Sequence, residues 1–195
     1  MPHANAATHH RPDTPVQILL DKEAIRELVL LYARAIDRRD IALLRDLYAE
    51  GATDTHGDAY DGDAEGFCDG LETALARYNY TGNHTCNHLI SVDGDTACGE
   101  VYALALHCLP DPQDPGALIE DLMAVRYLDQ YRRCADGKWR FASRFVTFDM
   151  RMIRPYTGTG LPGDTLPGDT LPGFGAMDPS YALCAARLFQ PGARA

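Results

Sequence analysis

The stretch DKEAIRELVLLYARAIDRRD, residues 21–40, decides how the rest of the chain is interpreted. Its apolar residues recur at the spacing of one helical face: Ile25, Leu28, Val29, Tyr32 and Ile36. This pattern predicts an amphipathic helix with Asp21 as its N-cap. Asp37 follows the stripe where the helix is about to end. On composition alone an exposed helix-end aspartate is favoured, and a place at the mouth of a cavity is the alternative.

Two further helices are expected before the sequence changes from a helical to a strand-like pattern. The first covers residues 41–49 and the second covers residues 64–78, each with leucine and aromatic residues on one side. Between them, residues 52–62 (ATDTHGDAYDG) are rich in Gly and Asp and predict at most a strand and a turn. The spacing of an EF-hand calcium loop is absent.

Long strands are expected in the second half of the domain, over residues 83–92, 96–109, 118–133 and 138–152. Asp93-Gly94-Asp95 is typical of a hairpin turn between the first two. Helices followed by antiparallel strands predict an α+β fold, in which a curved antiparallel sheet forms a cone-shaped barrel packed against three N-terminal helices.

The flanking segments differ in composition from this domain, which is assigned to residues 16–155. Residues 1–15 are polar and are expected to form a mobile N-terminal arm. Residues 156–195 form a Pro/Gly-rich C-terminal extension, where LPGDT occurs twice in succession and a short helix is expected over residues 180–189. Two copies of five residues are too few for a repeat fold.

Composition excludes several classes of function. The formal net charge of −10 argues against binding to nucleic acid or to anionic membranes. There is no run of 18 apolar residues and no apolar core of a secretory signal, so a cytoplasmic location is expected. The six cysteines are scattered without a CxxC pair and are interpreted as reduced thiols: Cys68, Cys86, Cys98, Cys108, Cys134 and Cys184.

Histidine and arginine residues in the strands are candidates for chemistry. His84 and His88 share parity on a predicted strand, so they are expected on one face, and either could face inward or outward. Too few further ligands lie nearby for a metal site. A histidine paired with Asp37 would be a suitable general base near neutral pH. Arg144 lies in an apolar row and must pair with a carboxylate or reach an anionic ligand.

The combined motifs YARAID (residues 32–37), NHLISVDGD (residues 87–95) and GKWRFASR (residues 137–144) resemble the SnoaL-like branch of the nuclear transport factor 2-like superfamily. The resemblance covers roughly residues 19–155, and a DPSY stretch at residues 178–181 also recurs in such proteins. Members include scytalone dehydratase, hexachlorocyclohexane dehydrochlorinase, bile-acid dehydratase and cofactor-free lyases of lignin-derived aromatics. The resemblance implies a conical pocket and a His–Asp dyad that removes a carbon-bound proton.

In this sequence the resemblance assigns the dyad aspartate to Asp37. Tyr32 and Arg144 are expected to stabilise the departing oxygen or enolate. The family's histidine position falls on Asn83, so His84, one residue later, is preferred as the base. The predicted pocket lining is His88, Tyr60, His56 and Met123.

The predicted function is cofactor-independent lyase activity, most plainly a dehydratase-like elimination on a hydrophobic aromatic or polycyclic small molecule. A narrower form of this prediction is a lyase that cleaves C–C bonds in a pathway of aromatic catabolism. A ketosteroid-type isomerase and a non-catalytic binding or assembly module are the alternatives. A homotrimer or dimer is expected, because one sheet face needs cover.

Overall fold

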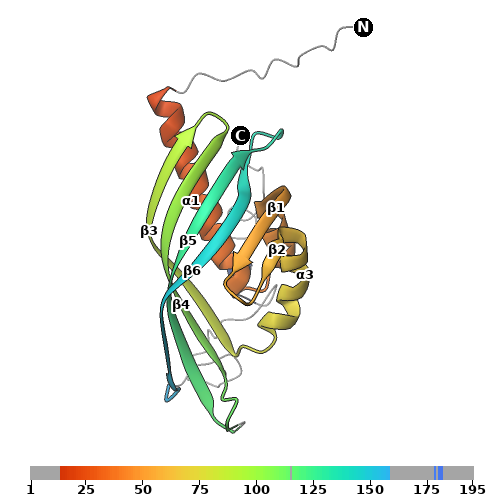
Figure 1. Cartoon of the computed structure of the whole chain (residues 1–195), viewed down its shortest axis with the longest axis vertical. Coiled ribbons are helices and arrows are strands. Elements are labelled where there is room, and N and C mark those ends of the chain that lie inside the picture. The colour runs from red at the N-terminus through yellow and green to blue at the C-terminus, as the bar shows by residue number, and fades with distance from the viewer. Residues whose placement is uncertain (1–13, 115, 159–177, 179, 182–195) are drawn as a thin grey trace.

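The computed structural model describes residues 14–114, 116–158, 178 and 180–181 (Figure 1). Within them, helices cover one face of a curved sheet. The elements in chain order are α1 (Pro15–Asp37), α2 (Ile41–Leu47), β1 (Tyr48–His56), β2 (Asp61–Asp63), α3 (Ala64–Leu75), β3 (Tyr80–Asp93), β4 (Thr96–Pro110), β5 (Leu118–Arg133) and β6 (Trp139–Pro155). The predicted α+β class with three helices on a curved sheet is confirmed. The predicted N-terminal arm and most of the C-terminal extension lie outside the described residues.

The first helix begins earlier than the sequence predicts. Thr14 is its N-cap and accepts a hydrogen bond from the backbone N–H of Gln17 (3.1 Å), so the assignment of Asp21 as N-cap is wrong. Asp21 is instead buried and accepts a hydrogen bond from Trp139 Nε1 (3.1 Å). It also pairs with Arg133 (2.7 Å). These contacts fasten α1 to the ends of β5 and β6. The predicted apolar stripe of α1 is buried.

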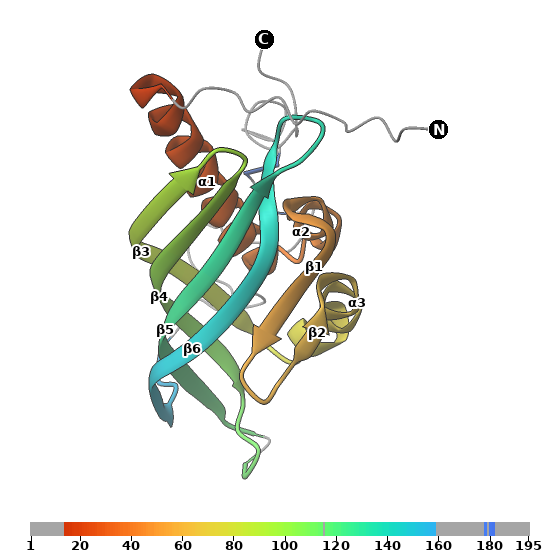
Figure 2. The same cartoon turned by 45° about the horizontal axis from the view of Figure 1, so that its top comes forward.

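The sheet is mixed and open rather than an antiparallel barrel. Its strand order is β2-β1-β6-β5-β4-β3, and the strands from β3 to β6 form an antiparallel meander. β1 pairs in parallel with β6, and β2 pairs with β1. Both strands overlap the Asp- and Gly-rich stretch in which the sequence predicts at most a strand and a turn, and β1 begins at Tyr48, within the residues predicted as the second helix. The sheet does not close, because β2 and β3 are its two edges (Figure 2).

Irregular positions in the ladders bend the sheet and change which side chains face α1. The β3–β4 register shifts between Thr85 and His88, and the β5–β6 register shifts beside Val125 and Tyr131. An extra residue on one strand bends that strand and reverses the alternation beyond it. We call the face packed against α1 the inner face, and the opposite face the outer face.

The core lies between α1 and the inner face of the sheet. Buried inner-face side chains include Val101, Ala103, Val125, Tyr127, Phe141 and Val146. Phe145 is about half exposed on the outer face. The far ends of β4, β5 and β6 extend past the helices, so the inner face there is less covered (Figures 1 and 2).

Candidate active site

Asp37 ends α1 and points its carboxylate at β3. The backbone N–H of Asn83 donates to its two oxygens (3.0 and 3.2 Å), and the Asn83 side-chain amide donates to one of them (2.6 Å). Burial raises the pKa of Asp37 above its usual value, although Asn83, Arg38 and His84 oppose the rise. Asp37 is therefore held beside the inner face, as expected of a site residue rather than of an exposed helix end.

The residue that holds Asp37 is an asparagine and not a histidine. His84 follows Asn83 on the strand, so its side chain is on the outer face and exposed. The hydrogen bonds described on the Asp37 carboxylate come from Asn83, so the expected Asp37–His84 pair is absent from the described contacts. His84 acts on Asp37 only as a nearby charge.

His88 does not share a face with His84, contrary to the parity argument. The bulge between Thr85 and His88 reverses the alternation, and His88 pairs with the buried Val101 on the inner face. Its Nε2 lies 3.3 Å from the hydroxyl of Tyr131, and burial lowers its pKa to about 4. His88 is a neutral core histidine in this position, away from Asp37's hydrogen bonds.

Arg144 forms a buried ion pair with Asp129. Its Nε and Nη2 donate to the two carboxylate oxygens of Asp129 (both 2.8 Å), and both side chains are fully buried. Its guanidinium carbon lies 4.0 to 4.3 Å from three ring centroids, those of Tyr32, Tyr127 and Phe141. Stacking on aromatic faces stabilises a guanidinium that has left water. Arg144 therefore supports Tyr32 from within the core.

A carboxylate–imidazole pair does exist, on β1. Asp54 is fully buried and accepts hydrogen bonds from the Tyr48 hydroxyl and from Nδ1 of His56. A carboxylate that accepts from Nδ1 favours the tautomer protonated there, so Nε2 of the neutral ring is an acceptor. Nε2 lies 3.5 Å from the hydroxyl of Tyr32, and the imidazole stacks on Phe67 with ring centroids 4.8 Å apart.

The exposure of this pair suits proton transfer. The side chain of His56 is 23% exposed, whereas that of Asp54 is 0% exposed. One ring nitrogen is thus held by a buried carboxylate while the imidazole itself remains partly exposed, the arrangement that a general base needs. The sequence contains the signal for this pair, because residues two apart on a strand share a face. The pair was not predicted, because residues 52–62 were interpreted as at most a strand and a turn and Asp54 was not considered as a partner for His56.

The remaining predicted lining residues lie near this pair or on the inner face. Tyr60 packs near Phe67 (centroids 5.5 Å apart) and donates its hydroxyl to the carbonyl of Asp63 (2.6 Å). Met123 is partly buried against the core and pairs with Ala105 in the ladder.

A second polar group, which the sequence argument missed, continues along the inner face from Asp37. His107 pairs with Thr81 and Asp121 on its two neighbouring strands. Burial lowers its pKa to about 4, Asp121 opposes this, and the charges of Arg39 and Arg151 add to it. Its Nδ1 is buried and has no hydrogen-bond partner among the described residues. A neutral imidazole here can donate to or accept from a bound polar group.

Tyr127 lies within electrostatic range of both carboxylates of the site. Burial raises the pKa of its hydroxyl to about 12, and the charges of Asp37 and Asp54 contribute. Its ring lies 6.1 Å from that of Tyr32. The candidate active site therefore comprises Asp37, Tyr32, Asp54, His56 and Tyr127, with His107 farther along the inner face.

Other parts of the described chain are weaker candidates. A groove of about 470 Å³ lies on the outer face, lined by Leu89, Ile90, Ser91, Cys98, Gly99, Glu100, Leu128, Asp129 and Gln130, and it carries no carboxylate–imidazole pair. No group of three or more metal-binding side chains occurs among the described residues. In the same residues the cysteines are free, and no helix is long and apolar enough to cross a membrane.

Comparisons with known proteins agree with this architecture. Residues 17–145 match the family model of the SnoaL-like domain. A hexachlorocyclohexane dehydrochlorinase (LinA) of type 2 is 23% identical, with a TM-score of 0.63 over 80% of this chain and 99% of that chain. The type 3 enzyme from Novosphingobium barchaimii LL02 is 20% identical, with a TM-score of 0.63 over 79% of this chain and 99% of that chain.

A third similar structure is a candidate scytalone dehydratase from Novosphingobium aromaticivorans DSM 12444. It is 20% identical, with a TM-score of 0.61 over 69% of this chain and 87% of that chain. At such identities the structural similarity shows the fold. The search among curated proteins found no match.

Proposed function

Because the chain belongs to the SnoaL-like domain family, we propose that it is a cofactor-independent lyase that eliminates a small leaving group from a hydrophobic, ring-bearing molecule. The observation that carries this proposal is the His56 imidazole, oriented by the buried Asp54 and facing the Tyr32 hydroxyl. The dehydratase and dehydrochlorinase names among similar structures are consistent with elimination.

In the proposed mechanism His56 is the general base. Nε2 takes a proton from carbon, the C–H electron pair forms the new double bond, and the bond to the leaving group breaks. Asp54 stabilises the resulting imidazolium and keeps the ring in the required tautomer. General-base action of this kind contributes typically about 10²–10⁴-fold.

Asp37 is the proposed proton donor to the leaving oxygen. Its raised pKa increases the fraction of the carboxyl that carries a proton near neutral pH. The Tyr32 hydroxyl would donate a hydrogen bond to the oxygen on which negative charge develops. The apolar and aromatic inner face supports an aromatic or polycyclic substrate, and cleavage of a C–C bond in aromatic catabolism is the narrower form of the proposal.

One observation favours an isomerase as the second candidate. Asp37 has a raised pKa and is held by Asn83 without a histidine, so a single carboxyl could take a proton and return it to the substrate. Elimination lowers the mass of the substrate, whereas isomerisation leaves the mass unchanged.

We also propose a homodimer or homotrimer. Large apolar side chains on the outer face are exposed, among them Leu89, Leu104, Leu128 and Phe145. Contiguous apolar surface of this kind usually marks an interface. Light scattering after size-exclusion chromatography measures the assembly.

The chain offers a matched pair of histidine variants to test the catalytic proposal. The protein is incubated in D₂O with a panel of aromatic and polycyclic alcohols and ketones, while mass spectrometry follows loss of water and NMR follows deuterium incorporation. We expect His56→Gln to lower the rate by at least about 10²-fold. The control His84→Gln should leave it unchanged, because His84 is on the outer face. The reverse result would refute the assignment, and a wild-type protein inert to the whole panel would favour a binding module.

A further inference from the structure

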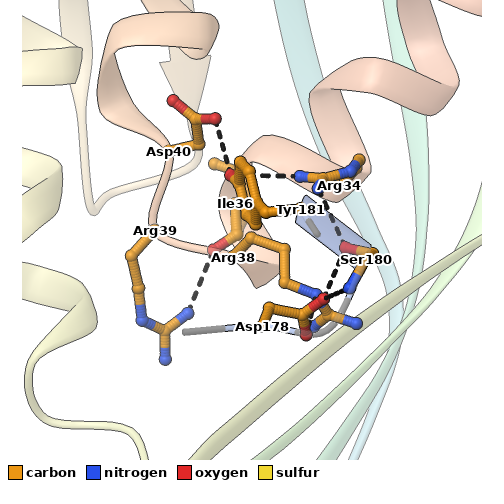
Figure 3. Close-up of polar contacts among 8 residues, drawn as sticks. All are labelled: Arg34, Ile36, Arg38, Arg39, Asp40, Asp178, Ser180 and Tyr181. Carbon is orange, nitrogen blue, oxygen red and sulfur yellow. Dashed lines mark hydrogen bonds and ion pairs between the residues drawn. The ribbon is translucent and has the colours of Figure 1, made fainter. Parts of the chain in front are cut away.

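The C-terminal residues Asp178, Ser180 and Tyr181 lie against the end of α1 and the turn that follows it (Figure 3). Asp178, which is buried, pairs with Arg38 (2.9 Å). The Tyr181 hydroxyl accepts from Arg34 (3.2 Å) and donates to Asp40 (2.6 Å). A segment far along the sequence therefore binds both sides of the turn beside Asp37.

These contacts are made by a compact and internally bonded group. The Arg34 guanidinium lies 4.4 Å from the centroid of the Tyr181 ring and donates to Ser180 Oγ (3.0 Å). The backbone N–H of Ser180 donates to Asp178 Oδ1 (2.9 Å), and that of Tyr181 donates to the Asp178 carbonyl (3.0 Å). One charged residue of α1, Arg34, and two of the following turn, Arg38 and Asp40, are thus bound by three residues of the C-terminal segment, which we call the clasp.

The turn that the clasp holds is conformationally demanding. Arg39 has φ of 58°, in the left-handed region that usually takes glycine at a helix end. The backbone N–H of Asp40 donates to the carbonyl of Ala35 (2.9 Å), and that of Arg39 donates to the carbonyl of Ile36 (3.2 Å), as in a Schellman motif. A non-glycine residue keeps such a conformation only where surrounding contacts impose it.

Each of the three residues after Asp37 has a contact that imposes this conformation. Arg38 is bound by Asp178, and the Arg39 guanidinium donates to Thr81 Oγ1 on β3 (2.6 Å). Asp40 uses one carboxylate oxygen to cap α2, accepting from Leu43 N–H (3.0 Å), and the other to accept from Tyr181. The clasp therefore supplies the contacts to the first and third residues of the turn.

We propose that the clasp is a positioning element of the candidate site: Asp178 and Tyr181 fix the turn after α1 and thereby hold the Asp37 carboxylate against Asn83. The importance of Asp37 for turnover rests on the proposed function, but the clasp's effect on Asp37 can be measured without any substrate. A failure of one proposal is therefore distinguishable from a failure of the other.

The test compares Tyr181→Phe and Asp178→Asn with wild type in the full-length chain. The amide N–H of Asn83, which donates to Asp37, reports the contact directly through hydrogen exchange. Tyr181→Phe removes two clasp hydrogen bonds, those with Arg34 and Asp40, so the local opening equilibrium, and hence the exchange rate, should rise by at least about five-fold. The amide of Val125 in β5 reports global opening and should be unaffected.

A ¹³C titration of the Asp37 carboxyl provides a second measurement. The charged or titratable groups that act on Asp37 are Arg38, Arg39, His84 and Tyr127. Removing Asp178 increases the influence of Arg38, and loosening the turn admits water, and both of these effects lower the pKa of Asp37. Loosening the turn also weakens the hydrogen bonds from Asn83, whose loss raises that pKa, so the measurement is a change from the wild-type pKa in either direction. The control Asp149→Asn removes an ion pair with Arg126 (2.7 Å) on the outer face and should change neither measurement.

Faster exchange at Asn83 alone, with an Asp37 pKa that differs from the wild-type value, supports the proposal. Wild-type exchange and titration in both variants would overturn it. Equal acceleration at Asn83 and Val125 would also overturn it, because the clasp would then only stabilise the fold.

Discussion

Replacing Asp129 with asparagine tests whether Arg144 is a structural residue. The two side chains are fully buried and joined by two hydrogen bonds of 2.8 Å, so Asp129→Asn keeps the shape but leaves a buried guanidinium without its counter-charge. Breaking a buried pair in this way costs about 3–5 kcal/mol. Since domains of this size are stable by about 5–15 kcal/mol, the loss should be evident in a urea titration.

The matched control is Asp149→Asn, which breaks the partly exposed pair with Arg126. An exposed pair contributes at most about 1 kcal/mol, so the urea midpoint should move little. The double variant Asp129→Leu/Arg144→Met should recover most of the stability lost in Asp129→Asn, because well-packed apolar residues can replace a buried pair. Equal losses in Asp129→Asn and Asp149→Asn would refute the assignment of Arg144 as a buried structural cation.

Two further predictions concern titratable groups. Asp37→Asn should lower turnover by orders of magnitude without lowering the free energy of unfolding at pH 7. Because the pKa of Asp37 is raised, the folded state binds the carboxyl proton more tightly than the unfolded state does. The stability that Asp37 contributes therefore falls as pH rises from 3.8 through its raised pKa. Urea midpoints at pH 4 and 7 check the sign, and a large loss of stability at pH 7 would contradict it. For His88 and His107, whose folded pKa values are about 4, the stability is fully present above pH 6.5 and is lost as pH falls toward 4. His107→Leu should remove about half of the resulting change in unfolding free energy between pH 6.5 and 4. An unchanged pH dependence would show that His107 titrates normally.

Much of the fold was predictable because its signals are local. The stripe of α1 and the turn at Asp93-Gly94 depend on neighbouring residues, and the predicted range of β5 agrees with the structure. β1 was missed because its identity as a strand depends on pairing with β6, near the other end of the domain. A sequence rich in Asp and Gly has low intrinsic strand propensity, and tertiary pairing overrides it.

The site was less predictable because two-residue alternation fails at bulges. A bulge before His88 and another beside Tyr131 exchange the inner and outer faces, and no glycine marks the bulge of β3. The parity rule, which holds only for a regular ladder, therefore placed His84 and His88 on one face, and His84 was preferred as the base from the family resemblance. His56 and Tyr32 were selected from the sequence, but the carboxylate that serves His56 was not.

The parallel pairing of β1 with β6 also determines when the site can assemble. Asp54 pairs with Arg144 in this ladder, and α3 and strands β2 to β5 are synthesised between them. Such long-range contacts form late, since the entropy of closing a large loop must be overcome first. During synthesis on the ribosome, the strand that carries His56 and Asp54 therefore has no β6 to pair with until the last strand emerges. Premature chain termination before β6 therefore removes the site together with the ladder that supports it.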